Sequence, residues 1–218
     1  MGDRSVRVVV VSGNGPGFSA GIDLGVLLAS AAGGPSELPP DVEPIQRAFT
    51  WLREAPFATV AAVHGFALGA GAQLALACDL RILSDDAVMG FPEVTFGIIP
   101  DLGGCAWLPE LVGSAKAREL AFLGERFDAA EALRIGLANR VVPVPQLEAT
   151  VDALATKLAS QAPLAIAGAK RAIDAGLHSA EAGLRESAAV VRRCLASDDF
   201  KEAGRAALEK RPPVFQGR

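Results

Sequence analysis

The chain has 218 residues, half of them apolar, so it can bury a substantial core in one domain or in one domain with an appended helical part. Its 21 basic and 25 acidic residues give a net charge of −4, which offers no electrostatic reason to expect nucleic acid or an anionic membrane as a partner. The cysteines, Cys78, Cys105 and Cys194, are far apart and form no C-x-x-C pattern. They predict neither a zinc site nor a disulfide framework and favour reduced thiols in a cytoplasmic protein.

The longest apolar stretch runs from Phe57 to Leu80 and is long enough to be mistaken for a membrane span. It contains His64, Gln73 and three glycines, and a proline precedes it. These residues favour a buried strand, a tight glycine loop and a buried helix, so we expect no membrane association. We also expect no secretory signal, because the charged first residues lead straight into a short valine run.

The first third of the chain predicts a strand, a glycine loop and a helix. Residues 7–12 (RVVVVS) are a β-branched run typical of a strand buried on both faces, and residues 13–21 form a glycine-rich loop. Residues 24–28 are apolar and compatible with the start of a helix. Residues 30–41, rich in glycine and proline, predict a flexible loop, and residues 42–54 carry apolar side chains at helical spacing.

The same order then recurs along the chain. Residues 58–64 predict a second buried strand, residues 65–71 a second glycine loop, and residues 72–78 an apolar helix. Short strands are expected at 80–83 and 88–91. Strands that alternate with helices predict an α/β chain with largely parallel pairing.

The last part of the chain is predicted to be mostly helical. Residues 92–104 are expected to form a loop, and the chain from Ala106 onward is interrupted by one strand-like segment at 138–142. Asp128 and Ser179 stand where they would cap helices. The C-terminal third therefore has the character of a helical addition and not of an independent domain.

The first glycine loop, Gly13 to Asp23, offers little chemistry by itself. Its G-x-G-x-G spacing does not match the dinucleotide motif, Pro16 removes an amide, and a Walker-type Lys-Ser/Thr is absent. A phosphate-binding loop is therefore disfavoured, and the motif alone indicates a tight turn.

The second glycine loop, Gly65 to Gly71, follows a buried strand and opens a helix. The first amides of a helix lack internal partners and lie at the positive end of its dipole. Such amides stabilise an oxygen that gains negative charge. Close strand–helix packing also requires small residues, so this segment alone leaves both interpretations open.

Four longer segments occur in a fixed order: Phe18-Ser-Ala-Gly-Ile-Asp-Leu24, Ala62-Val-His-Gly-Phe-Ala-Leu-Gly-Ala-Gly71, Ala77-Cys-Asp-Leu-Arg81 and Phe91-Pro-Glu-Val-Thr-Phe-Gly-Ile-Ile-Pro-Asp-Leu-Gly-Gly104. Together they resemble the signatures of the crotonase family, also called the enoyl-CoA hydratase/isomerase family. Their residues are most similar to the corresponding motifs of dienoyl-CoA isomerases. The resemblance extends from about Val6 to the end of the chain.

This resemblance implies an α/β fold of the crotonase type, a spiral of strand–strand–helix turns followed by helices that mediate trimer contacts. We expect residues 1–142 to form the spiral core with a CoA-thioester site, and residues 143–218 to form the C-terminal helical region. A homotrimer or hexamer is implied in the same way. Family chains normally have a strand hairpin and a helix before the segment matched by residues 6–12, so we expect this N-terminal part of the fold to be missing.

For the site, the resemblance implies an acyl-CoA substrate whose thioester oxygen lies between the backbone amides of Ile22 and Ala70. The family usually has glycine where this chain has Ala70, but the amide is still present. Further substrate and CoA contacts are implied for Ala20, Gly21, Asp23, Leu24, Gly69 and Gln73. Coenzyme A enters as part of the substrate, so we expect no separate cofactor and no metal.

The acid–base groups decide which reaction is expected. Hydratases of the family use two glutamates; Glu93 matches one of them, and Gln73 stands in place of the other. Glutamine neither takes up nor releases a proton near neutral pH, which disfavours hydration. Asp101 matches an acid of the dienoyl-CoA isomerases, so the resemblance implies proton-shuttling isomerisation by Glu93 and Asp101. Aryl-CoA dehalogenases use an aspartate at this site as nucleophile but lack the glutamate matched by Glu93.

Other interpretations remain open. A catalytically degenerate acyl-CoA-binding protein is suggested by Gln73 and by the short N-terminal part. A purely structural trimer subunit would bind no CoA. Apart from the resemblance, Glu93 is explained as a helix N-cap or a surface ion pair, and Asp101 as a helix N-cap.

Overall fold

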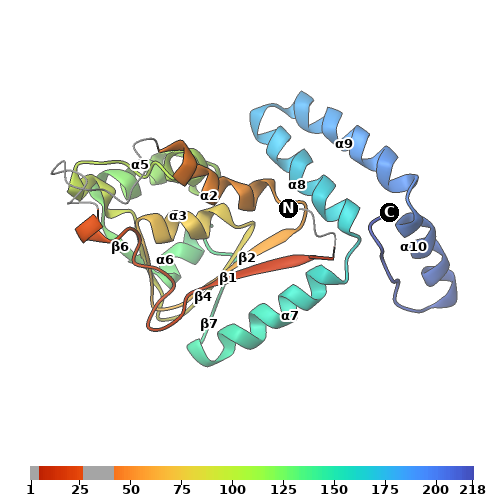
Figure 1. The fold of residues 1–218 in the computed structure, drawn as a ribbon, viewed down its shortest axis with the longest axis horizontal. Coiled ribbons are helices and arrows are strands. Elements are labelled where there is room, and N and C mark those ends of the chain that lie inside the picture. The colour runs from red at the N-terminus through yellow and green to blue at the C-terminus, as the bar shows by residue number, and fades with distance from the viewer. Residues whose placement is uncertain (1–4, 27–41) are drawn as a thin grey trace. The chain divides into compact units, whose positions relative to one another are not determined.

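The computed structural model describes residues 5–26 and 42–218 (Figure 1), so the predicted loop at 30–41 lies outside the described residues. The chain divides into two compact units, which are described separately. We call Val10–Arg53 with Thr59–Asp152 the core unit, and Met1–Val9, Glu54–Ala58 and Ala153–Arg218 the helical unit.

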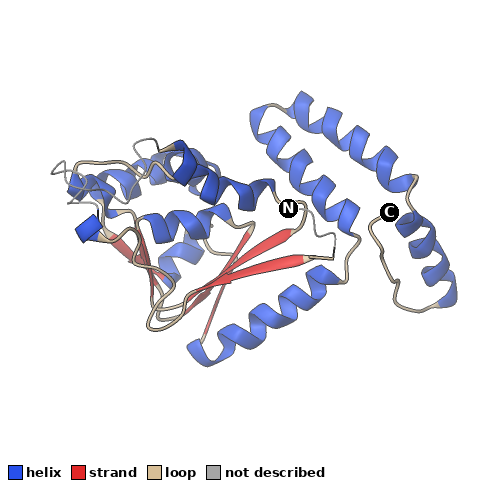
Figure 2. Cartoon of the chain, viewed as in Figure 1, coloured by secondary structure: helices blue, strands red, loops and turns tan. Residues whose placement is uncertain are grey.

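The larger sheet of the fold has four strands (Figure 2). Its strands, in the spatial order β1-β2-β4-β7, are β1 (Val8–Ser12), β2 (Ala58–Val63), β4 (Leu80–Ser84) and β7 (Arg140–Val142). Every residue of β2 is buried, as an unbroken apolar run predicts for a strand covered on both faces. Strand β4 pairs in parallel with β2 and with β7, so the predicted parallel pairing is confirmed.

A second sheet of three short strands has the order β3-β5-β6. Its members are β3 (Phe66–Leu68), β5 (Val88–Gly90) and β6 (Arg126–Asp128); β5 pairs in parallel with β3 and antiparallel with β6. The predicted glycine loop at 65–71 contains β3, and β6 interrupts the region after Ala106 that was predicted to be mostly helical, so both strands were missed. Three residues are too few to show the two-residue period of a strand, and strands this short are stabilised only by pairing with their neighbours.

The helices of the core unit complete the spiral. They are α2 (Glu43–Glu54), α3 (Ala70–Ala77), α4 (Gly104–Val112), α5 (Ser114–Leu123) and α6 (Ala129–Arg134). The orders β2-β3-α3 and β4-β5-α4 each form one strand–strand–helix turn, which confirms the predicted fold. The expected loop at 92–104 contains a short 3-10 helix, η1 (Pro92–Phe96), which prediction missed. Asp128 caps α6 as predicted, since its Oδ1 accepts a 2.8 Å hydrogen bond from the Glu131 amide.

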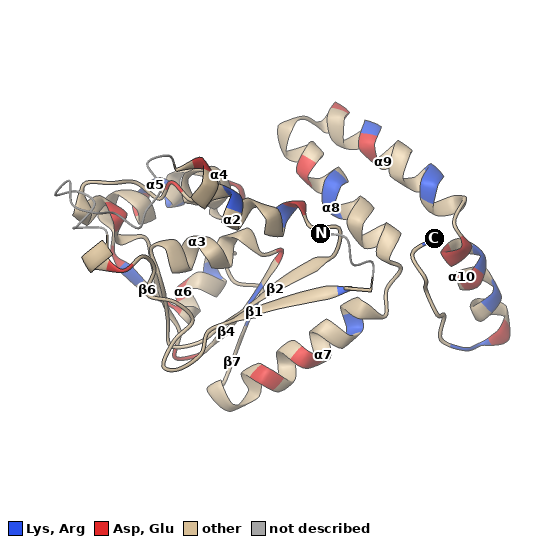
Figure 3. Cartoon of the chain, viewed as in Figure 1, with Lys and Arg blue, Asp and Glu red and all other residues tan. Residues whose placement is uncertain are grey.

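The strands of the larger sheet are almost free of charge, whereas acidic and basic residues are spread over the helices (Figure 3). Arg81 on β4 and Arg140 on β7 are the exceptions, and only 3% of Arg81 is exposed. Its guanidinium donates to four main-chain oxygens, those of Leu137 (2.7 Å), Cys78 (2.5 Å), Ala75 (3.4 Å) and Asp79 (3.4 Å). Burial lowers the pKa of Arg81 to about 10. The side chain therefore binds the carbonyl end of α3 and ties it to the segment before β7.

Replacing Arg81 by methionine should destabilise the fold, because the buried carbonyls at the end of α3 would lose their donor. We expect the free energy of unfolding to fall by about 2–4 kcal/mol. This value is net of the desolvation cost of the buried guanidinium, which the methionine variant no longer has. Chemical denaturation measures it, with Arg126→Met on β6, an exposed position, as the matched control. Equal stability of the two variants would contradict the anchoring role.

The helical unit is built from the end of α7 (Leu147–Ala159) and from α8 (Pro163–His178), α9 (Ala180–Leu195) and α10 (Asp198–Glu209). Helices α8 and α9 run side by side as a hairpin (Figure 1). Ser179 caps α9 as predicted, since its Oγ accepts a hydrogen bond from the Ala182 amide. Of the helices in the described part of the chain, none is long and apolar enough to cross a bilayer.

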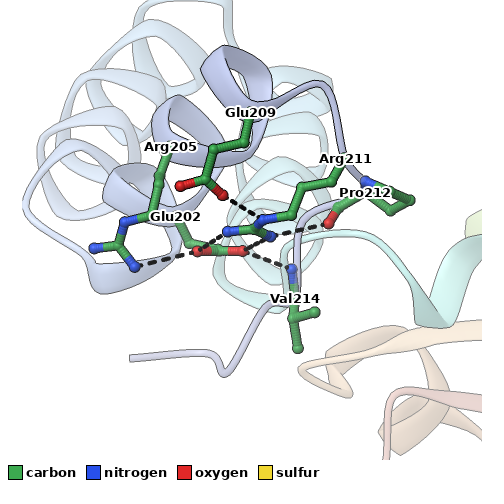
Figure 4. A network of polar contacts seen from close by, with 6 residues as sticks. All are labelled: Glu202, Arg205, Glu209, Arg211, Pro212 and Val214. Carbon is green, nitrogen blue, oxygen red and sulfur yellow. Dashed lines mark hydrogen bonds and ion pairs between the residues drawn. The ribbon is translucent and has the colours of Figure 1, made fainter.

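Carboxylates of α10 hold the C-terminal tail (Figure 4). Glu202 accepts two hydrogen bonds from the guanidinium of Arg211, at 2.6 and 3.2 Å, and one from the Val214 amide at 3.2 Å. Asp199 is buried and accepts from the amides of Gln216 (2.6 Å) and Gly217 (2.9 Å). The hydrogen bond from Arg211, followed by that from Val214, lowers the pKa of Glu202 to about 2.

Attachment of the tail should therefore depend on pH. A carboxyl with a depressed folded pKa stabilises the folded state above its unfolded pKa, and this contribution is lost as the pH falls. Between about pH 4.5 and pH 2 the Val214 amide should lose protection from hydrogen exchange. Glu202→Gln should weaken this protection already at neutral pH, whereas Glu148→Gln on α7 should not. Unchanged protection in Glu202→Gln would show that Asp199 suffices to hold the tail.

Candidate active site

The two glycine loops of the core unit are hydrogen-bonded to each other. The Ser19 amide donates to the carbonyl of Phe66, and the Leu68 amide donates to the carbonyl of Ser19, both at 3.0 Å. A side chain at Gly71 would clash with the carbonyl oxygen of Ser19. The packing explanation left open by the sequence is therefore confirmed for Gly71, and this packing is what places the first loop against the start of α3.

The predicted amide donors, Ile22 and Ala70, stand on these adjoining segments. Gly21 has φ +94°, and a Cβ there would lie 2.8 Å from the Leu68 carbonyl oxygen and 3.2 Å from the Ala70 nitrogen. The residue before Ile22 thus lies directly against the first amide of α3. Because Ala70 opens that helix, its N–H has no acceptor within the helix. The preceding Gly69 adopts φ 53°, which turns the chain into the helix.

The residues around Ile22 form a short turn. Oδ1 of Asp23 accepts hydrogen bonds from the amides of Gly25 (2.7 Å) and Val26 (3.2 Å). Residues 24–26 are helical, and the remainder of the expected helix start lies outside the described residues. Leu24 is 50% exposed, and Ala20 is exposed as well. Both are therefore accessible in the loop, as the predicted substrate contacts require.

Glu93 lies in η1, and only 6% of it is exposed. Its Oε1 accepts a 2.7 Å hydrogen bond from Nε2 of Gln73, while Oε2 is buried and has no hydrogen-bond partner among the residues that the structure describes. A Cβ on Gly69 would lie 3.5 Å from Oε1, so the carboxyl lies beside the start of α3. The alternative interpretation of Glu93 as an N-cap or a surface ion pair is therefore wrong.

Burial is the largest cause that raises the pKa of Glu93, and the charge of Asp101 raises it further. Hydrogen bonds from its own backbone and from Gln73 act in the opposite direction. A carboxyl of this kind is suited to exchange a proton with a bound substrate, because its pKa lies closer to neutral pH than that of an exposed glutamate.

Gln73, on α3, is 1% exposed and is bonded at both ends of its amide. Its Oε1 accepts a 3.0 Å hydrogen bond from the Gly104 amide, opposite the bond that Nε2 donates to Glu93. A Cβ at Gly104 would lie 3.1 Å from that oxygen and would clash with Pro100. The sequence interpretation did not identify Gly104 as part of the site. The Gly103-Gly104 pair was its only signal.

Asp101 is half-buried and precedes α4. Its carbonyl oxygen accepts a 2.7 Å hydrogen bond from Nε2 of Gln46 on α2, a contact that was not foreseen. Helix α4 begins at Gly104 with Gly103 as its N-cap and no side-chain cap bond, so the interpretation of Asp101 as an N-cap is wrong. The Asp101 charge acts on Glu93, which brings the two predicted acid–base groups into one electrostatic site.

Comparison with known proteins adds independent evidence. A family model described as enoyl-CoA hydratase/isomerase matches residues 1–218. A protein of Arabidopsis thaliana named "Probable enoyl-CoA hydratase 2, mitochondrial" is 38% identical over 217 residues, which is 99% of this chain and 71% of the relative. Carnitinyl-CoA dehydratase of Proteus mirabilis is 37% identical and is covered over 84% of its length by 99% of this chain.

Solved structures agree with the sequence relatives. The crystal structure of an enoyl-CoA hydratase from Bacillus anthracis superimposes with a TM-score of 0.85 at 36% identity, covering 100% of this chain and 84% of that one. With the fold, both glycine loops and the buried glutamate in place, and with the family model matched from end to end, the chain belongs to the enoyl-CoA hydratase/isomerase, or crotonase, family.

Proposed function

We propose that the protein is an enzyme that acts on an acyl-CoA thioester and moves a proton between carbons of the acyl group. The observation that carries this proposal is the buried carboxyl of Glu93, which lies beside the start of α3 and whose Oε2 has no partner among the described residues. A buried carboxyl beside free helix amides supports proton transfer to or from a molecule whose oxygen those amides bind.

In the proposed reaction the thioester oxygen lies between the amides of Ile22 and Ala70, which stabilise the negative charge of an enolate-like intermediate. Glu93 removes a proton from the acyl chain, and the pair of electrons left on carbon moves toward that oxygen. Asp101, or Glu93 itself, returns a proton at another carbon. One well-placed amide in such a hole contributes about 3–4 kcal/mol to the transition state.

Isomerisation is favoured over hydration because Gln73 occupies the place of a second acid. Addition of water needs one group to deprotonate water and one to protonate carbon. The Gln73 amide is held by Glu93 and Gly104 and has no proton to exchange near neutral pH. Moving a double bond needs only one carboxylate that can take a proton and return it, so it fits the residues present.

Exposed apolar side chains support the rest of the proposal. In the segment that follows Glu93, Val94, Phe96, Ile98 and Ile99 are 41–62% exposed, which suits an acyl group. On α8 and α9, Ile173, Leu177, Leu184, Val191 and Leu195 are 50–73% exposed, which supports a homotrimer or hexamer. We propose no cofactor apart from the coenzyme A of the substrate. The cysteines carry reduced thiols, which suit the reducing cytoplasm.

A catalytically degenerate acyl-CoA-binding protein is the second candidate. Gln73 favours it, because the side chain at this position cannot act as an acid or base. The two candidates make the same prediction for acyl-CoA binding and differ only in proton exchange.

Incubation with 2-enoyl- and dienoyl-CoA substrates in heavy water, read by mass spectrometry, tests the proposal. We expect deuterium incorporation or double-bond migration without added water, and a decrease of about 10²–10⁴-fold in Glu93→Gln. Since the base form is the carboxylate, kcat/KM should rise with pH through the raised pKa of Glu93. Addition of one water would show a hydratase, and binding without exchange would show the degenerate binder.

The Ala70 amide can be removed separately from the rest of the site. Proline is tolerated at the first position of a helix, where its missing N–H has no helical acceptor. Ala70→Pro should therefore leave α3 folded and lower kcat by about 10²–10³-fold. Ala70→Gly, which keeps the amide, is the matched control and should retain activity. Similar activity in both variants would mean that this amide does not bind the thioester oxygen.

A further inference from the structure

The two oxygens of the Glu93 carboxyl are not equivalent. Oε1 accepts the 2.7 Å hydrogen bond from Nε2 of Gln73, whereas Oε2 is buried and has no partner within residues 5–26 and 42–218. A proton added to Oε1 would compete with the N–H that already points at it, whereas a proton added to Oε2 meets no donor. The environment of the carboxyl therefore distinguishes the two atoms.

The Gln73 amide can adopt only one orientation. Its carbonyl oxygen accepts from the Gly104 amide at 3.0 Å, and the reversed amide would place its NH2 group against that N–H. Reversal would also place the amide oxygen against the Glu93 carboxylate. Both contacts would be repulsive in a buried site, where an unsatisfied polar group is destabilising. The absence of a side chain at Gly104 leaves the space for this arrangement.

Few other charged groups affect this carboxyl. Asp101, before α4, raises the pKa of Glu93, and the thiol of Cys105 on α4 interacts electrostatically with both carboxyls. Helix α5 also packs against η1. Its charged residues are engaged elsewhere: Lys116 pairs with Glu119 and Glu131, and Arg118 donates to Ser114. Gln73 is thus the side chain that distinguishes the two Glu93 oxygens.

We infer that Gln73 is a positioning residue: its amide reserves Oε1 of Glu93 as a hydrogen-bond acceptor and leaves Oε2 as the atom that carries the exchanged proton. In this step a lone pair of Oε2 takes the proton of an acyl C–H bond, and the bonding electrons pass into the enolate. The same O–H then breaks when the proton returns to another carbon. This inference rests on the proposed function of Glu93 as the proton carrier.

Side-chain NMR reports the position of the proton without requiring turnover. Protein labelled with 13C at the glutamate carboxyl carbon and with 15N at the glutamine amide is titrated with acid, and Glu93→Gln and Gln73→Met assign the signals. If Oε2 takes the proton, Oε1 stays an acceptor, and the two Nε2 protons of Gln73 stay strongly inequivalent through the Glu93 titration. If Oε1 takes it, the two protons converge as Glu93 is protonated, and the inference is overturned.

Variants test whether the hydrogen bond matters for exchange. In Gln73→Met the Glu93 titration should move to higher pH, because a bond that favours the carboxylate is lost, and deuterium exchange into acyl-CoA should fall about 10–100-fold. Gln146→Met, at an exposed position, is the matched control and should change neither. An unmoved Glu93 titration in Gln73→Met would overturn the positioning role.

Gln73→Glu keeps the shape of the side chain and guards against misfolding in Gln73→Met. Its carboxyl replaces the amide donor only while protonated, so the two carboxyls should share one proton and titrate as a coupled pair. Exchange should then fall on both sides of a pH maximum. A profile identical to that of the unmodified protein would count against the inference. If the unmodified protein shows no exchange but the NMR pattern holds, the proposed function fails while the placement of the proton stands.

Discussion

A short chain of buried hydrogen bonds, from the Gly104 amide through Gln73 to Glu93, determines where the proposed chemistry takes place. Each link lies in an apolar core, where losing one partner would cost about 1–3 kcal/mol, so the position of one residue fixes the next. The chain joins the first turns of α3 to η1 and the start of α4, which come from two successive turns of the spiral. A carboxylate that is held from the side in this way keeps its position when no substrate is bound, and this is the preorganisation that proton transfer requires.

The amide side of the site depends on a different constraint, the close approach of two loops. Glycine at position 71 lets the carbonyl of Ser19 approach α3, and Gly21 at φ +94° brings the first loop against the Ala70 nitrogen. Because both residues are glycines, the two loops pack closely enough for their predicted amide donors to be neighbours. At its other end α3 is bound by the buried Arg81, so the helix that presents Ala70 and Gln73 is held at both ends. The residues that pack the two loops together are also those of the proposed site, so the packing explanation and the amide-donor explanation of the glycine loop do not exclude each other.

Much of this could be predicted from the sequence, and the omissions have physical reasons. Long apolar runs such as 58–63 predict a strand buried on both faces from the local sequence alone, without knowledge of the neighbouring strands. The three-residue strands β3 and β6 do need partners, and no local pattern reveals them. Glu93 and Gln73 were both predicted as site residues, but their hydrogen bond joins positions 20 residues apart and has no local sequence pattern. The Gly104 amide was missed because a Gly-Gly pair does not by itself indicate a hydrogen-bond donor to the site. The N-cap interpretation of Asp101 failed because the helix begins three residues later, at Gly104.

The free-energy cost of burying the Glu93 carboxyl is itself an argument for the proposed function. A buried carboxyl with one unpartnered oxygen destabilises the fold when it is ionised, and an apolar side chain of similar volume would satisfy the core better. Gln73 relieves only part of this cost, because it bonds one oxygen and leaves the other. A purely structural carboxyl would be expected to have both oxygens paired or exposed to water. In the proposed reaction a proton from a bound acyl chain meets this oxygen, and the neighbouring amides and the raised pKa of Glu93 both support that partner.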